Sequence, residues 1–317
     1  MALRAGCVLG VFDALDHARA MDDVAERTGA DQDVLARYLR VLLDLGLVVA
    51  GPDGYSLTEM GATFRSDHPS RLCDLVLMRT EPNTVAAWTD LDHALRSGDG
   101  VYERVNGVSH WQHLAAHPDL ERVFNAAMAR RGLAEAQTLL ESVDLDGVSL
   151  LVDVGGGRGA MVGELLAARP DLKAVVADRA AVAEEATSFL AARGFADRAR
   201  GVPCDFFSSV PPGGDVYTMA HVLHDWTDDE CIRILRTVRE AMLPEARLMV
   251  LERLLDMPGR DPMQQRELHL LDLHMLVLFG ARERTRAEYD ALFVAAGFES
   301  PRVSGAADWN VLEAVPA

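Results

Sequence analysis

The second half of the chain alternates short apolar runs with segments of helical periodicity. The strand-like runs fall at 150–154, 173–178, 200–205, 215–223, 247–254, 299–304 and 309–315. Helix-like segments separate the first five runs, and two more, near 263–279 and 285–296, precede the last pair. This alternation predicts an α/β fold with a doubly wound parallel sheet, which binds ligands at the carboxyl ends of its strands. Because only a short turn separates the last two runs, we expect them to pair antiparallel at the sheet edge.

The first third of the chain has a different pattern. Helical periodicity covers 8–15, 21–29 and 33–45, and Asp31 is placed to cap the third helix. Residues 47–58 predict a hairpin around a Pro-Asp-Gly turn. Three helices and a hairpin make a winged-helix unit, and the segment that follows looks mostly helical. We therefore divide the chain into a winged-helix and helical domain, residues 1–110, and a ligand-binding α/β domain, residues 111–317.

Charge tests the idea that the winged-helix unit binds DNA. Residues 1–70 contain six arginines against eleven acidic side chains, and the whole chain has a net charge of −18. A DNA-binding module has the opposite electrostatic footprint. We expect no binding to nucleic acid or to an anionic membrane surface, and assign this unit to dimerisation or to covering a substrate pocket.

Other features of the sequence indicate a soluble, cytoplasmic protein. No apolar run reaches the roughly 18 residues of a membrane helix, and the start of the chain has no convincing signal-peptide cleavage site. The four cysteines, Cys7, Cys73, Cys204 and Cys231, are scattered along the sequence. Their spacing argues against a disulfide framework or a zinc site and fits a reducing compartment.

A glycine-rich turn follows the first predicted strand of the α/β domain. Gly155 and Gly157 lie between that strand and a predicted helix at 160–168. Glycine lets the backbone approach a ligand closely, and a helix start offers unpaired N–H groups. The turn fits both the dinucleotide pattern and the Gly-x-Gly-x-Gly turn of S-adenosylmethionine enzymes, and Asp178 at the end of the next strand could hold ribose hydroxyls in either. A nucleotide-like ligand is expected, and the motif leaves its identity open.

The next predicted strand ends also carry polar side chains. Asp205 and Phe206 follow the third strand, where a carboxylate can accept from an adenine amine and a ring can stack on the base. His224 follows the fourth strand and Glu252 ends the fifth. A single histidine is often just a buried core residue, but its position beside a nucleotide turn favours a catalytic role.

With these residues the chain resembles the S-adenosylmethionine-dependent small-molecule O-methyltransferases of the caffeate and hydroxyindole type, especially the bacterial relatives that act on aromatic natural products. The resemblance covers nearly the whole chain. It rests on Asp153-Val-Gly-Gly-Gly-Arg-Gly159, Asp205-Phe-Phe207, Val222-Leu-His-Asp-Trp226 and Gly280-Ala-Arg-Glu-Arg-Thr285, with Ala296-Gly-Phe298 behind them.

The resemblance implies a role for each matching position. The residues that would hold the cofactor are Asp153, Gly155, Gly157, Asp178, Asp205 and Phe206. The residues that would form the catalytic group, with a histidine general base flanked by two acids, are His224, Glu252 and Glu283. The residues that would contact the planar substrate are Met128, Asp225 and Met275. The resemblance also implies a homodimer formed by the winged-helix domain.

The sequence departs from the family pattern in three places. Ala180 stands where many members have proline, and Ala220 where plant members have a lysine that contacts the cofactor. The chain also begins later than members that carry an additional N-terminal helix used in dimer exchange.

The chemistry of methyl transfer agrees with this assignment. A phenol with a pKa near ~10 must lose its proton to react well, and histidine can accept it. We find no cluster of metal ligands at the predicted strand ends and expect no metal. The main alternative is a relative that keeps S-adenosylmethionine but catalyses hydroxylation, decarboxylation or another step without methylation. A nicotinamide oxidoreductase and a winged-helix regulator are further alternatives, disfavoured by the Leu-His-Asp-Trp motif and by charge.

Overall fold

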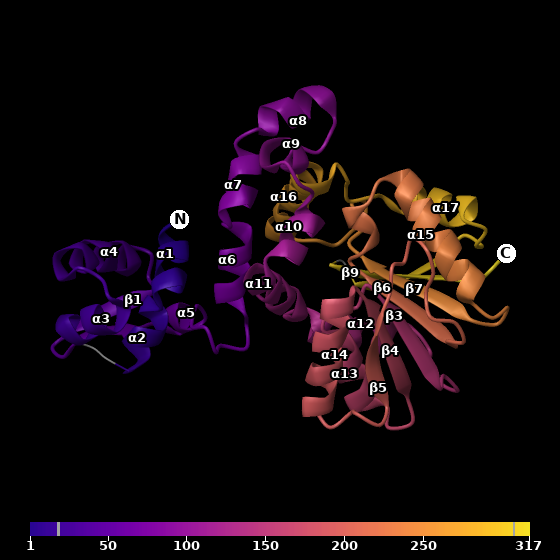
Figure 1. Ribbon diagram of the computed structural model, residues 1–317, viewed down its shortest axis with the longest axis horizontal. Coiled ribbons are helices and arrows are strands. Elements are labelled where there is room, and N and C mark those ends of the chain that lie inside the picture. The colour runs from indigo at the N-terminus through magenta and orange to yellow at the C-terminus, as the bar shows by residue number, and fades with distance from the viewer. Residues whose placement is uncertain (18–19, 307) are drawn as a thin grey trace. The chain divides into compact units, whose positions relative to one another are not determined.

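The computed structural model describes residues 1–17, 20–306 and 308–317, so Arg19, one of the six arginines counted above, lies outside the described residues. The chain forms two compact units. The N-terminal unit comprises residues 1–86 and 111–130, and the sheet unit comprises residues 87–110 and 131–317 (Figure 1). The predicted division at residue 110 does not coincide with these units. The reason is that residues 87–110 pack into an apolar cluster with Val277 and Leu278 of the sheet unit.

The N-terminal unit contains the predicted helices and hairpin. Its elements are α1 (Ala2–Leu9), α2 (Val11–His17), α3 (Met21–Thr28), α4 (Gln32–Asp44), β1 (Val48–Gly51), β2 (Gly54–Leu57), α5 (Glu59–Ala62), α6 (Leu72–Arg79) and α11 (Pro118–Ala129). Asp31 caps α4 by accepting a hydrogen bond from the backbone N–H of Val34, as predicted. The single helix predicted over 8–15 is wrong, because Gly10 adopts a left-handed conformation (φ 66°) that separates α1 from α2.

A buried core holds the N-terminal unit together. Leu35, Leu39 and Leu42 form the inner face of α4 and are almost fully buried. Two of the cysteines that are distant in sequence meet in this unit, where the thiols of Cys7 and Cys73 form a hydrogen bond. Sequence spacing therefore gave no information about this pair, because α1 and α6 pack together only in the folded chain.

The sheet unit contains a seven-stranded, mostly parallel sheet. Its strands are β3 (Leu150–Val154), β4 (Lys173–Asp178), β5 (Ala199–Pro203), β6 (Val216–Ala220), β7 (Arg247–Glu252), β8 (Arg302–Ala306) and β9 (Trp309–Ala314), in the order β5-β4-β3-β6-β7-β9-β8. β9 runs antiparallel to both β7 and β8, which confirms the predicted antiparallel edge. The strand predicted over 215–223 is shorter than expected, because His221 has φ 54° and ends the extended conformation.

Helices cover both faces of the sheet. The helices of this unit are α8 (Leu91–Ser97), α9 (Tyr102–Asn106), α12 (Gly132–Ser142), α13 (Ala160–Ala168), α14 (Ala180–Ala192), η1 (Leu223–Asp225), α15 (Asp228–Ala241), α16 (Pro262–Phe279) and α17 (Arg286–Ala295). Two more, α7 (Pro82–Trp88) and α10 (His110–Ala116), lie where the chain passes between units. One core packs α15 and α17 on one face, and the other packs α12, α13 and α14 on the opposite face (Figure 1). In the part of the chain that the structure describes, no helix has the length and apolar character needed to span a membrane.

The close packing of α14 on β5 yields a prediction about Gly201. A Cβ atom at this position would lie 1.9 Å from the carbonyl oxygen of Ala183. We expect Gly201→Ala to lower the free energy of unfolding by about 1–3 kcal/mol, as overpacked sites do. Arg200→Ala, an exposed change on the same strand, should stay within about 0.5 kcal/mol of the wild type. Urea-induced unfolding compares the two, and equal stabilities would contradict the close approach.

Candidate active site

The glycine turn lies at the carboxyl end of β3. Gly155 and Gly157 have φ angles of 71° and 56°, which side chains other than glycine rarely adopt. A Cβ atom on Gly155 would lie 2.7 Å from the side chain of Val222, and the ring of Phe206 is the next neighbour. Apart from the neighbours of Gly157 in the chain, no atom of the described residues lies within 4 Å of the corresponding position on this glycine. The turn is therefore closely packed at its first glycine and open at its second.

Two acids organise this turn. Asp178 at the end of β4 accepts a hydrogen bond from the backbone N–H of Gly157 at 2.9 Å, so the structure brings these two predicted residues together. Asp153 is buried beneath the turn, where its carboxylate accepts a hydrogen bond from the hydroxyl of Thr218 at 2.7 Å. Burial raises the pKa of Asp153 to about 7. Asp153 thus supports the turn from below.

Asp205 and Phe206 lie beside the same edge of the sheet. The backbone N–H of Cys204 donates to the carbonyl of Asp178 at 2.8 Å, which fixes this loop next to the end of β4. The carboxylate of Asp205 accepts hydrogen bonds from the N–H of Phe207 (3.1 Å) and the hydroxyl of Ser208 (2.7 Å). Phe206 makes an edge contact with Trp226 at a centroid distance of 5.8 Å. The three cofactor positions outside the first strand and its turn, Asp178, Asp205 and Phe206, are therefore grouped around the turn.

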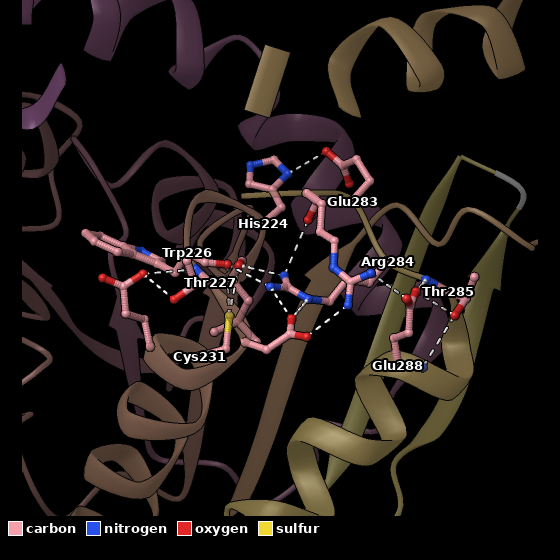
Figure 2. A network of polar contacts seen from close by, with 12 residues as sticks. His224, Trp226, Thr227, Cys231, Glu283, Arg284, Thr285 and Glu288 are labelled. Atoms are coloured by element: carbon pink, nitrogen blue, oxygen red, sulfur yellow. Dashed lines mark hydrogen bonds and ion pairs between the residues drawn. The ribbon is translucent and has the colours of Figure 1, made fainter. Parts of the chain in front are cut away.

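His224 lies in η1, directly after β6, with the two predicted acids beside it. Its Nδ1 atom is 2.8 Å from Oε1 of Glu283 (Figure 2). The same atom is 3.5 Å from Oε2 of Glu252. The other oxygen of Glu252 accepts hydrogen bonds from the backbone N–H groups of Leu223 (3.0 Å) and His224 (3.3 Å). The side chains of both glutamates are fully buried. The structure thus assembles the predicted histidine–carboxylate group from β6, β7 and the loop before α17.

Burial and mutual charge set the protonation of this group. Burial alone would lower the pKa of His224, but the carboxylates of Glu283, Glu252 and Asp225 raise it to about 10. Burial raises the pKa of Glu252 to about 7 and that of Asp225, 3.6 Å from Nε2 of His224, to about 6. The site therefore stabilises an imidazolium that is hydrogen-bonded through Nδ1.

Comparison with known proteins identifies the family of this chain. The O-methyltransferase domain family matches residues 88–299, and the O-methyltransferase dimerisation domain matches residues 1–67. The chain belongs to the O-methyltransferase family. This membership agrees with the fold, the antiparallel sheet edge and the glycine turn described above.

Individual relatives of this methyltransferase come from antibiotic pathways. A mitomycin biosynthesis 6-O-methyltransferase of Streptomyces lavendulae is 36% identical over 305 residues, covering 95% of this chain and 86% of the relative. The solved structure of the mitomycin 7-O-methyltransferase MmcR has a TM-score of 0.90 at 35% identity and covers 100% of this chain and 93% of its own. NcsB1, an O-methyltransferase from neocarzinostatin biosynthesis solved with S-adenosylmethionine and 2-hydroxy-5-methyl naphthoic acid, has a TM-score of 0.85 at 29% identity, with 100% and 95% coverage.

The two predicted substrate methionines of this methyltransferase lie in different units. Met275 is 5% exposed on α16, a helix that packs against η1. Met128 lies on α11 of the N-terminal unit, where it is partly buried. Met275 therefore shares a unit with His224, and contact of either methionine with a substrate stays a prediction.

Sequence reasoning gave no role to Arg284, which supports the loop that contains His224. Its fully buried guanidinium donates hydrogen bonds to the carbonyls of Leu223 (3.0 Å) and Trp226 (2.7 Å) and to Asp228 (2.8 Å; Figure 2). These bonds hold both ends of η1. The alternating charges of the Arg-Glu-Arg motif gave no sign that Arg284 is buried while Arg282 is half exposed.

Sequence reasoning also missed His221. Its buried ring lies with Nδ1 3.7 Å from Glu252 and Nε2 3.8 Å from Glu135. The expectation that no metal-ligand cluster occurs at the strand ends is wrong, because ligand atoms of His221, His224 and Glu252 lie within 4.8 Å of one another. The spacing concealed this cluster, since β6 and β7 are neighbours only in the sheet.

The support given by Arg284 can be tested through stability. Arg284→Met removes the hydrogen bonds to Asp228 and to the carbonyls of Leu223 and Trp226. Because the two carbonyls are largely buried and keep only poorer partners, we expect the free energy of unfolding to fall by about 2–4 kcal/mol. Arg282→Met is the matched control, because Arg282 also pairs with Asp228 but is 47% exposed, and it should cost less than about 1 kcal/mol. Urea-induced unfolding of both variants provides the measurement. Similar losses in the two variants would show that burial of Arg284 does not matter.

Proposed function

We propose that this O-methyltransferase transfers a methyl group from S-adenosylmethionine to a phenolic hydroxyl of an aromatic natural product. The observation that carries the proposal is the buried pair of His224 and Glu283, 2.8 Å apart, at the same sheet edge as the glycine turn. The complex of NcsB1 with a hydroxynaphthoic acid supports a phenolic acceptor. The mitomycin biosynthesis named for one relative supports an acceptor from a natural-product pathway, and we propose a polyketide or a similar aromatic compound.

The residues around the glycine turn fit S-adenosylmethionine. The open position above Gly157 gives a ligand access to the backbone, and the carboxylate of Asp178 lies beside it for ribose hydroxyls. Asp205 and Phe206 offer an acceptor and a ring for adenine, while Asp153 and Gly155 shape the turn. When bound, S-adenosylmethionine supplies an electrophilic methyl group on a positively charged sulfur.

In this mechanism His224 accepts the proton of the acceptor hydroxyl. Nδ1 is held by Glu283, so Nε2 is the nitrogen available to a substrate. Glu283 and Glu252 stabilise the positive charge that the ring acquires, as in other histidine–carboxylate pairs. With its pKa raised to about 10, His224 matches a phenol, whose pKa is also about ~10. Imidazolium with phenolate contains the same number of protons as imidazole with phenol, so both pairs reach the same transition state. A complex of imidazolium with neutral phenol has one proton more and must release it to water before the methyl group is transferred.

The base and the buried carboxylates provide what the transfer needs without a metal ion, so we propose a metal-independent reaction. Intact His224, Glu252 and Glu283 also favour methylation over the alternative in which S-adenosylmethionine is kept for another reaction. The match of residues 1–67 to a dimerisation domain supports a homodimer. The N-terminal unit would then form the subunit interface, and Met128, Asp225 and Met275 would contact the aromatic acceptor.

Replacing the base tests the proposed mechanism. His224→Ala should lower methyl transfer at least about 100-fold, because general-base catalysis contributes about 10²- to 10⁴-fold. Affinity for S-adenosylhomocysteine should stay within about threefold, since His224 is not among the cofactor residues. The assay follows the mass gain of one methyl group on a panel of phenols, and calorimetry measures cofactor affinity. His269→Ala, an exposed histidine of α16, is the control. Nearly full turnover of the His224 variant would refute the base assignment.

Replacing Asp178 tests the cofactor site. Asp178→Asn keeps an oxygen that can accept from the N–H of Gly157 but loses the charge that favours ribose hydroxyls, so the dissociation constant of S-adenosylmethionine should rise roughly 10-fold or more. Asp171→Asn, an exposed change just before β4, should leave it unchanged. Calorimetry on both variants is the measurement. Unaltered affinity in the Asp178 variant would place the ribose elsewhere.

A further inference from the structure

Four buried polar atoms of the sheet unit have no hydrogen-bond partner among the residues that the structure describes. They are both ring nitrogens of His221, Oε2 of Glu252 and Oε2 of Glu283. Buried polar atoms in folded proteins nearly always have partners, and a group of exceptions at one place indicates a catalytic role, a bound water or a bound ion. The proposed methyl transfer uses the two glutamates to orient His224 and assigns no role to His221.

The positions of these atoms suit a metal ion. Nδ1 of His221 is 3.7 Å and Nδ1 of His224 is 3.5 Å from the same oxygen of Glu252. A tetrahedral zinc ion with bonds of ~2.0–2.2 Å holds its ligand atoms roughly 3.4 Å apart. Ligand atoms of all three residues also lie within 4.8 Å of one another, so the group is close to the spacing that a single ion needs. Glu283, whose Oε1 already lies 2.8 Å from Nδ1 of His224, is within reach as a fourth ligand.

The donor set selects the kind of ion. Two imidazoles with carboxylates suit Zn²⁺, Co²⁺, Ni²⁺ or Cu²⁺, whereas Mg²⁺ and Ca²⁺ prefer oxygen ligands alone. The carboxylates of Asp225 and Glu135 lie close to the two histidines and add negative charge, while Arg131 and Arg253 oppose it. Because several acids share this buried space, a divalent cation would relieve their mutual repulsion.

We propose that His221, His224 and Glu252, with Glu283 as fourth ligand, bind a divalent transition-metal ion such as Zn²⁺, and that the ion inhibits methyl transfer. Coordination through Nδ1 of His224 displaces the Nδ1 proton to water and leaves the remaining proton on Nε2. The ring then has no free nitrogen to accept the proton of a phenol. The proposal that the metal binds does not depend on the proposed function, whereas the proposal that it inhibits methyl transfer rests on that function.

Direct binding tests the site on the full-length, untagged protein. Dialysis against EDTA followed by titration with Zn²⁺ in a calorimeter should show one ion per chain with a micromolar or lower dissociation constant. Co²⁺ should give the visible absorption of a four-coordinate ion with nitrogen and oxygen ligands. His221→Asn should weaken binding of both ions at least 10-fold, and asparagine suits the positive φ of this position. His269→Asn, on the exposed side of α16, is the matched control and should bind as the wild type does.

The outcomes separate the two parts of the proposal. No Zn²⁺ binding at 100 µM (about the upper limit for a specific site), or equal binding by wild type and His221→Asn, would overturn the site. Methyl transfer that falls with added Zn²⁺ and recovers with EDTA supports inhibition, and the His221→Asn variant should then need at least 10-fold more Zn²⁺ for the same loss. Activity that is lost in EDTA and restored by Zn²⁺ would overturn inhibition. Tight binding by a protein that methylates no acceptor would leave the site intact and refute the proposed function instead.

Discussion

The hydrogen bond between Nδ1 of His224 and Glu283 is the interaction on which the rest of the site depends. It joins the loop after β6 to the loop before α17, two segments that are 59 residues apart in sequence. Both side chains are removed from water, so neither ionised form would be stable there alone. The pair gives the imidazole a fixed orientation and a raised pKa, and leaves its second nitrogen for a substrate.

Further hydrogen bonds fix the positions of the loops that contain His224 and Glu283. Arg284 binds the backbone at both ends of η1, and Glu252 accepts from two N–H groups within it. Asp272 of α16 accepts a hydrogen bond from the backbone N–H of Glu283 at 2.8 Å. The loop that contains His224 is therefore bound by charged side chains on several sides. Such contacts would hold the proposed general base in a fixed position.

The sheet explains why these groups lie near the glycine turn. β3, β4, β6 and β7 are parallel neighbours, so their carboxyl ends and the residues that follow share one edge. The glycine turn follows β3, Asp178 ends β4, His224 follows β6 and Glu252 ends β7. The same proximity that builds the active site also brings His221 next to Glu252. Acids and histidines gathered for proton transfer are also metal ligands, which is why one edge can support both chemistries.

Much of this protein could be read from its sequence, since some features depend only on local patterns. The period of apolar residues predicted the strands and helices of the sheet unit, and Asp31 marked the start of α4 because capping is local. The glycines and Asp178 were identifiable because a nucleotide turn requires special backbone angles at fixed spacing. The position of His224 at a strand end, together with the Leu-His-Asp-Trp motif, was enough to select it.

Only the tertiary structure decided the features that depend on which side chains meet. His221 became part of a cluster because β6 and β7 are adjacent, and Cys7 met Cys73 because α1 packs on α6. The charge pattern of the sequence does not distinguish Arg284, which is buried, from Arg282, which is exposed. Residues 87–110 belong to the sheet unit, which likewise follows from long-range packing. Local periodicity and spacing are encoded in neighbouring residues, whereas burial and pKa arise from contacts between segments far apart in the chain.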